Sequence, residues 1–170
     1  AREAISDFFI ARTKVILRDE GLPIDAVNAV LAAGVTEPAL IAARTRALAA
    51  ARASSPETMT DLATAFARAD NLRDASLGSK TDTSLFTPEE ADLQAAIDAV
   101  TAAIPDLLNQ GDYVRALEKL ASLRAPIDTF FEAVMVMDKD QTLRENRLRL
   151  LNRFVSTFKD VADFGELASS

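Results

Sequence analysis

Apolar residues recur along this chain at spacings of three and four, and glycine or proline interrupts most runs, which is typical of consecutive α-helices. The sequence shows no strand-like alternation of apolar and polar residues. Alanine and leucine dominate, while the 170 residues include only 5 glycines and 6 prolines, a composition that favours helix. The sequence therefore predicts an all-α fold: a helical bundle preceded by a small helical subdomain.

Capping residues place several helix ends. Gly21 and Gly111 suit the left-handed position that follows a helix. The run Thr87–Glu90, TPEE, offers a capping threonine, a proline in the first turn and a glutamate that can close a capping box. Asp138 is expected to cap the last long helix, with Gln141 at its third position.

The segment 76–86, SLGSKTDTSLF, is polar and rich in turn residues. We expect it to be the one long loop of the chain and the boundary between two parts. The predicted organisation is an N-terminal helical subdomain over residues 1–75, a loop or linker over 76–86, and a C-terminal helical bundle over 87–170.

Composition excludes several kinds of chemistry. The chain contains no cysteine and no histidine, so disulfides, thiol or imidazole catalysis and the usual zinc ligand sets are excluded. A carboxylate site for Mg²⁺ or Ca²⁺ stays open, although no EF-hand spacing and no phosphate-binding glycine loop is found. No apolar stretch approaches the roughly 20 residues that span a bilayer. We expect a cytoplasmic protein with no membrane partner, no metal site and no catalytic residues of its own.

The formal net charge of −7 argues against nucleic-acid binding when it is taken alone, but the charges are unevenly spread. The segment Gln141–Arg153 contains four arginines, with Glu145 as its only acid. Arg147 lies three residues from Leu150 and therefore on or beside the buried stripe of that helix. Its guanidinium must find a carboxylate at a helix–helix contact, helix-end carbonyls, or a phosphate.

The other arginines of this helix have different roles in the pattern. Arg149 and Arg153 share the opposite face and are expected to be solvated.

In an earlier segment, Arg68 and Asn71 are three residues apart and hence on one helix face. Arginine can stack on or fork to a base and asparagine can read a base edge, whereas the alternative is an ordinary polar face.

Phe130 and Phe131 could stack on unpaired RNA bases. Neighbouring residues of a helix point about 100° apart, so the two rings cannot share one binding face, and at least one is expected in the core. An exposed remainder of the segment Phe130–Met137 could instead meet a protein partner.

From Asp112 onward the chain reads DYVRALEKLASLRAPIDTFF, followed by VMVM, LRENRLRLL and finally VADFGEL. These runs resemble the C-terminal region of the bacterial glycyl-tRNA synthetase beta subunit. The portion LRENRL from Leu143 is similar to the helical DALR anticodon-binding domain, with the name-giving tetrapeptide reading QTLR here. The segment AFARADNL from Ala65 resembles the family's RVxNI stretch, and Phe8–Arg18 resembles its FFxxRxKVxLR segment.

The resemblance implies a role in tRNA recognition. The family is an α₂β₂ ligase that joins glycine to its tRNA with ATP, and the terminal helical domain of its beta subunit holds the anticodon. This chain would then be part of a several-fold longer subunit and bind glycine tRNA through Arg68, Asn71, Arg144 and Arg147. No cofactor is expected in it, because ATP and Mg²⁺ belong to the alpha subunit, its expected protein partner. The alternative is a non-catalytic helical protein-interaction module.

Overall fold

The computed structural model describes residues 2–167, which form α-helices and short 3-10 helices and contain no strand. The all-α prediction is confirmed. The helices are α1 (Arg2–Asp19), α2 (Ile24–Ala32), α3 (Pro38–Ser54), α4 (Pro56–Leu72), α5 (Pro88–Asn109), α6 (Tyr113–Ala121), α7 (Arg124–Ala133) and α8 (Gln141–Phe158). The 3-10 helices are η1 (Ala75–Leu77), η2 (Thr83–Leu85) and η3 (Phe164–Glu166).

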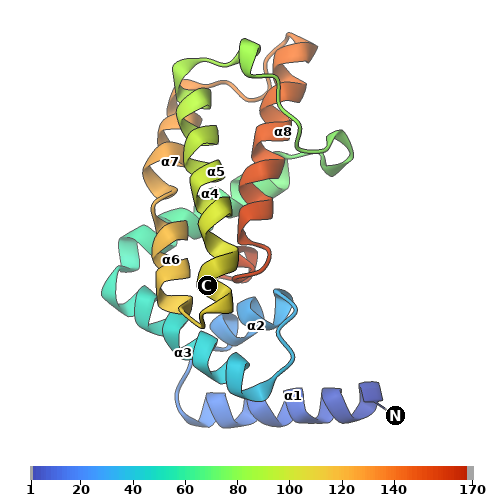
Figure 1. Ribbon diagram of the computed structural model, residues 1–170, viewed down its shortest axis with the longest axis vertical. Coiled ribbons are helices and arrows are strands. Elements are labelled where there is room, and N and C mark those ends of the chain that lie inside the picture. Colours follow the sequence, from blue (N-terminus) through green and yellow to red (C-terminus); the bar gives the residue numbers. More distant parts are fainter. Residues whose placement is uncertain (1, 168–170) are drawn as a thin grey trace.

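Helices α5 and α8 and the consecutive pair α6 and α7 run along the long axis of the molecule (Figure 1). Helix α5 packs against α6, α7 and α8, while α4 crosses the bundle and contacts α6, α7 and α8. Helices α2 and α3 lie toward one end, and α1 lies crosswise beyond them at the lower edge of the view (Figure 1). No helix within residues 2–167 has the length and apolarity that crossing a bilayer requires.

One hydrophobic core joins buried residues from α2 to the residues after α8. Its aromatic centre is built from Phe66 of α4, Phe154 and Phe158 of α8, and Phe164 of η3. The Phe158 ring lies edge-on to the other three, with centroid distances of 5.0 Å to Phe66, 5.1 Å to Phe154 and 5.0 Å to Phe164. This arrangement fixes α4 against α8, the two helices that carry all four predicted site residues.

The predicted helix ends hold in most places. At the start of α5 the Thr87 hydroxyl accepts from the Glu90 N–H and the Glu90 carboxylate accepts from the Thr87 N–H, which confirms the capping box. Gly21 and Gly111 adopt φ of 85° and 73°, the left-handed conformation that a side chain would strain.

The cap of α8 differs from the expectation. Asp140, not Asp138, is the N-cap, and its carboxylate accepts from the N–H groups of Thr142 at 2.9 Å and Leu143 at 3.4 Å. The helix begins at Gln141, so Asp138 lies two residues before the N-cap position. Its carboxylate instead accepts from the Asp140 N–H at 2.8 Å. Both aspartates shape the turn that leads into α8.

Candidate nucleic-acid interface

Arg147 is buried at the contact between α8 and the start of α5. Its Nε donates to Glu90 Oε1 at 2.9 Å, and the two side chains are 8 % and 1 % exposed. The other oxygen of Glu90 accepts from the Thr87 N–H at 2.7 Å, so one carboxylate closes the capping box and neutralises the arginine. Of the acceptors that the sequence left open for Arg147, the structure provides a carboxylate at a helix–helix contact, and the guanidinium faces protein groups.

Arg147 and its neighbour Arg144 also hold the segment 134–140 that leads into α8. The Nη1 of Arg147 donates to the Met135 carbonyl at 2.8 Å and lies 3.4 Å from an Asp138 carboxylate oxygen. The half-buried Arg144 donates to the Asp138 carbonyl at 3.0 Å. Both candidates therefore bind the same loop from α8, and Arg144 is the more accessible of the two side chains.

The held segment alternates between core and solvent. Val134 and Val136 are buried, whereas Met135 is 71 % exposed and Met137 is 56 % exposed. A sequence pattern of apolar residues cannot distinguish these positions, because all four look equally suited to a core. The backbone, which is extended at Val134 and turns at Val136 and Met137, decides which of them face outward.

Arg68 lies on the surface of α4, with its guanidinium carbon 4.1 Å from the centroid of the Phe131 ring. Phe130 is fully buried and Phe131 only partly, which confirms that the two rings do not share a face. The sequence did not indicate that Phe131 would be the partner of Arg68. Asn71 is exposed one turn further along α4. Arg68 and Phe131 make a cation–π pair at the surface of α4, and an exposed planar guanidinium can stack on a base.

Acidic groups border this pair. The depression beside Arg68 is lined by charged, polar and aromatic side chains and by Ala65: Asp61, Thr64, Ala65, Arg68, Asp128, Phe131 and Glu132. Burial raises the pKa of the Asp128 carboxyl, with a further contribution from the Asp61 charge. Arg124 donates to Asp61 at 2.6 Å and lies 3.8 Å from Asp128. Such a surface repels phosphate locally and suits contacts to bases better than contacts to backbone.

Helix α8 also has a structural role that the sequence analysis did not predict: it anchors the loop between α4 and α5. The buried Asn152 amide donates to the carbonyls of Asp74 at 2.8 Å and Gly78 at 2.6 Å. The Asn146 amide donates to the Asp82 carbonyl at 3.0 Å and accepts from the Asp82 N–H at 2.8 Å. Asparagine can do both because its amide carries donors and an acceptor.

Arg149 and Arg153 take part in the same anchoring, so the expectation that they are merely solvated is wrong. Arg149 donates to the Leu77 carbonyl at 3.3 Å, and Arg153 donates to the Ser79 carbonyl at 3.4 Å and pairs with Asp98. Both side chains stay partly exposed. The polar loop is therefore bound along α8 by side chains that lie 64 to 78 residues away in sequence.

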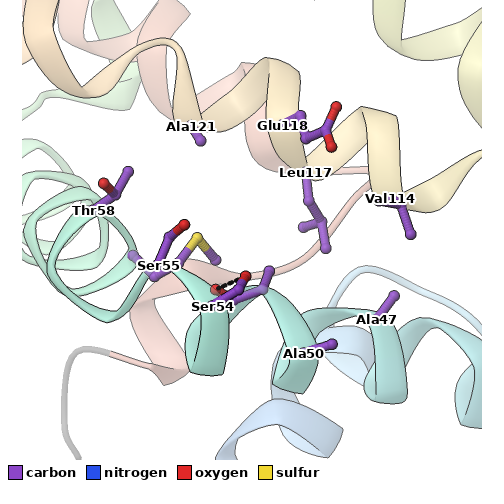
Figure 2. Close-up of a pocket in the computed structure, with 11 residues that line it drawn as sticks. Ala47, Ala50, Ser54, Ser55, Thr58, Val114, Leu117, Glu118 and Ala121 are labelled. Carbon is purple, nitrogen blue, oxygen red and sulfur yellow. Dashed lines mark hydrogen bonds between the residues drawn. The ribbon is translucent and has the colours of Figure 1, made fainter.

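A groove between α3, α4 and α6 has a different character (Figure 2). It is lined mainly by alanines, small hydroxyl residues and Leu117, with Glu118 at its rim, and no arginine or lysine is among its lining residues. Figure 2 shows these short side chains pointing into an open space. Without a cation, the groove is a poor candidate for phosphate binding.

The comparisons agree with the helical site described above. Residues 62–164, more than half of the chain, match the model of the DALR anticodon binding domain. That range contains all of Arg68, Asn71, Arg144 and Arg147. The resemblance drawn from the sequence is thereby confirmed.

Curated relatives are similar over nearly the whole chain. It is 39 % identical over 166 residues to the glycine–tRNA ligase beta subunit of Haemophilus influenzae strain PittEE, covering 96 % of this chain and 24 % of that protein. It is 40 % identical over 164 residues to the same subunit of Desulforamulus reducens, covering 96 % and 23 %. The Acidobacterium capsulatum subunit is 37 % identical over 182 residues, covering 100 % and 26 %. The chain thus spans about a quarter of the length of these relatives.

Proposed function

Because the chain belongs to the DALR anticodon-binding domain family, we propose that it binds the anticodon stem-loop of a tRNA, and that this tRNA is the one for glycine. The family match over residues 62–164 is the observation that carries the proposal. The choice of glycine tRNA rests on relatives named glycine–tRNA ligase beta subunit.

In this proposal the role of each residue follows from how accessible its side chain is. The outer face of Arg68 over Phe131 stacks on an unpaired base, and Asn71 reads a base edge from the same face of α4. Arg144 and the exposed Lys139 neutralise backbone phosphates. Arg147 is a positioning residue that holds segment 134–140 through the Met135 carbonyl. The acidic remainder of the chain disfavours unspecific nucleic acid.

We further propose that the chain works as part of a glycine–tRNA ligase, with an alpha subunit as its protein partner in an α₂β₂ assembly in the cytoplasm. ATP and Mg²⁺ would be bound by the alpha subunit. Among the side chains that the structure describes, no three acidic groups lie together as a metal site would require, and the sequence has no phosphate-binding glycine loop.

One observation favours the second candidate, a protein-interaction module. Met135 and Met137 project an apolar surface from an otherwise fixed segment, and methionine is common on protein-binding surfaces. Phe130 cannot contribute, because its ring is fully buried. A partner protein on this surface would make binding insensitive to tRNA identity.

The test is a titration of glycine tRNA and of a non-cognate tRNA against the chain at low and moderate salt. Cognate tRNA should bind more tightly, and added salt should weaken both complexes. Arg68→Ala should weaken cognate binding about tenfold by removing a stacking surface. Arg144→Ala should lower the salt dependence by about one phosphate contact.

Arg115→Ala is the matched control, because it removes an exposed arginine from α6, outside the proposed interface. It should leave the affinity ratio of the two tRNAs unchanged. Equal binding of both tRNAs, indifferent to Arg68 and Arg144, would refute anticodon binding and favour the interaction module.

A further inference from the structure

Helix α1 carries two apolar faces, of which only one is used in this structure. Its inner face contributes the fully buried Leu17, which packs with Val27 of α2 and Ile41 of α3, while Ile10 packs at the edge of this small cluster. Leu17 and Ile10 thus tie α1 to the two helices that cover it, so the inner face accounts for the position of α1.

The outer face is made of large apolar side chains that are between 46 % and 61 % exposed: Ile5, Phe8, Phe9, Val15 and Ile16. At 100° per residue these five positions fall within an arc of about 120°, on the side of the helix away from Leu17. The rings of Phe8 and Phe9 lie edge to face with centroids 5.8 Å apart. Half of the large exposed apolar residues of the described chain lie on this one helix.

A helix that is apolar on opposite sides is normally buried on both. Isolated exposed apolar residues are common on proteins, but a contiguous patch of this kind marks an interaction surface. In Figure 1, α1 lies at the lower edge of the molecule with no other element beyond it, so the outer face is open for a partner of helix length.

We propose that the outer face of α1 packs against another folded part of the same synthetase subunit. The curated relatives are about four times as long as the stretch that this chain matches, so most of each relative lies outside the match and can supply that surface. Arg12 lies near the middle of the outer arc and is exposed. The partner surface is therefore apolar with a carboxylate facing Arg12, because a covered guanidinium requires an acceptor. The proposal depends on family membership and is independent of anticodon binding.

Thiol labelling tests the proposal, because the chain contains no cysteine. Phe9→Cys places one thiol on the outer face. The position is half exposed, so we expect the variant to fold, which circular dichroism verifies. The same substitution is made in a full-length Haemophilus influenzae beta subunit whose matched part is replaced by this chain. The rate of maleimide labelling is measured by mass spectrometry on the tryptic peptide that carries the new thiol. This peptide is 3–12 for Phe9→Cys and 81–115 for the control Ala102→Cys, which lies on the exposed side of α5.

We expect Phe9→Cys to react at least about tenfold more slowly in the full-length subunit than in the isolated chain, and Val15→Cys to behave alike, because covered thiols react only when the contact opens. Equal rates at position 9 in both proteins would overturn the proposal. Slowing of the isolated chain with rising concentration would assign the face to a second copy. Slowing only after addition of tRNA would assign it to RNA; either result also overturns the proposal. All other rates are measured without tRNA, so a failure of anticodon binding does not affect them.

Discussion

Replacing Arg147 by methionine removes the charge from the buried contact between α8 and α5 while keeping a side chain of similar length. The Glu90 carboxylate, 1 % exposed, then loses the guanidinium 2.9 Å from Oε1 and keeps the Thr87 N–H as its partner. The Met135 carbonyl loses its 2.8 Å hydrogen bond as well. The substitution therefore leaves a carboxylate without its cation inside the protein.

The expected cost follows from that burial. Removing one partner of a buried ion pair typically destabilises a protein by about 3–5 kcal/mol, because the remaining charge stays desolvated. Domains of this size have a free energy of unfolding of about 5–15 kcal/mol, so the variant should fold but unfold at a clearly lower urea concentration. Adding Glu90→Gln to Arg147→Met should recover part of the loss, since no unpaired charge is left behind.

Urea denaturation followed by far-ultraviolet circular dichroism measures this loss. Arg149→Met is the matched control, because it makes the same change two residues further along α8 at a side chain that is partly exposed. Its cost should be below about 1 kcal/mol. The reasoning is refuted if Arg147→Met costs no more than Arg149→Met, or if the double variant is no more stable than Arg147→Met alone.

Other consequences can be checked with the same assay. Asn152→Ala should cost about 1–3 kcal/mol and speed amide hydrogen exchange in the loop 73–86, because two carbonyls lose their buried donor. Tyr113→Phe should cost about 1 kcal/mol, since the buried hydroxyl donates to the Val161 carbonyl at 2.8 Å; equal stability would contradict it. Burial raises the pKa of the Asp128 carboxyl above 3.8, so its charge opposes folding at neutral pH and this penalty fades as the pH falls through the raised pKa toward 3.8. Asp128→Asn should therefore gain stability relative to the unsubstituted chain at neutral pH and lose that advantage in acid.

Local signals were sufficient where a structure depends on neighbouring residues. The capping box of Thr87 and Glu90 involves residues three apart, and the sequence identified it directly. Periodicity likewise placed Leu150 on a buried stripe, and Leu150 is fully buried. It also showed that Arg147 required an acceptor, but the acceptor, Glu90, lies 57 residues away and could not be chosen from spacing.

Where two choices satisfy the same pattern, only the packed structure decides between them. On α1 the apolar stripe with Phe8 and Ile16 faces solvent, because the opposite side with Leu17 fits against α2 and α3. No local pattern identifies the role of Asn152, because its hydrogen bonds run to a loop more than 70 residues earlier. The division into residues 1–75 and 87–170 remains a prediction about folding units, although their buried side chains share one core.

Anticodon dependence is the decisive property for the proposed function. The affinity of the chain is measured for glycine tRNA and for the same tRNA with only its anticodon bases replaced, at one fixed salt concentration. Base-edge and stacking contacts through Arg68 and Asn71 predict that the replaced anticodon binds about tenfold or more weakly, while the phosphate contacts stay the same. Equal affinities for the two tRNAs would show that the chain does not read the anticodon and would contradict the proposed function.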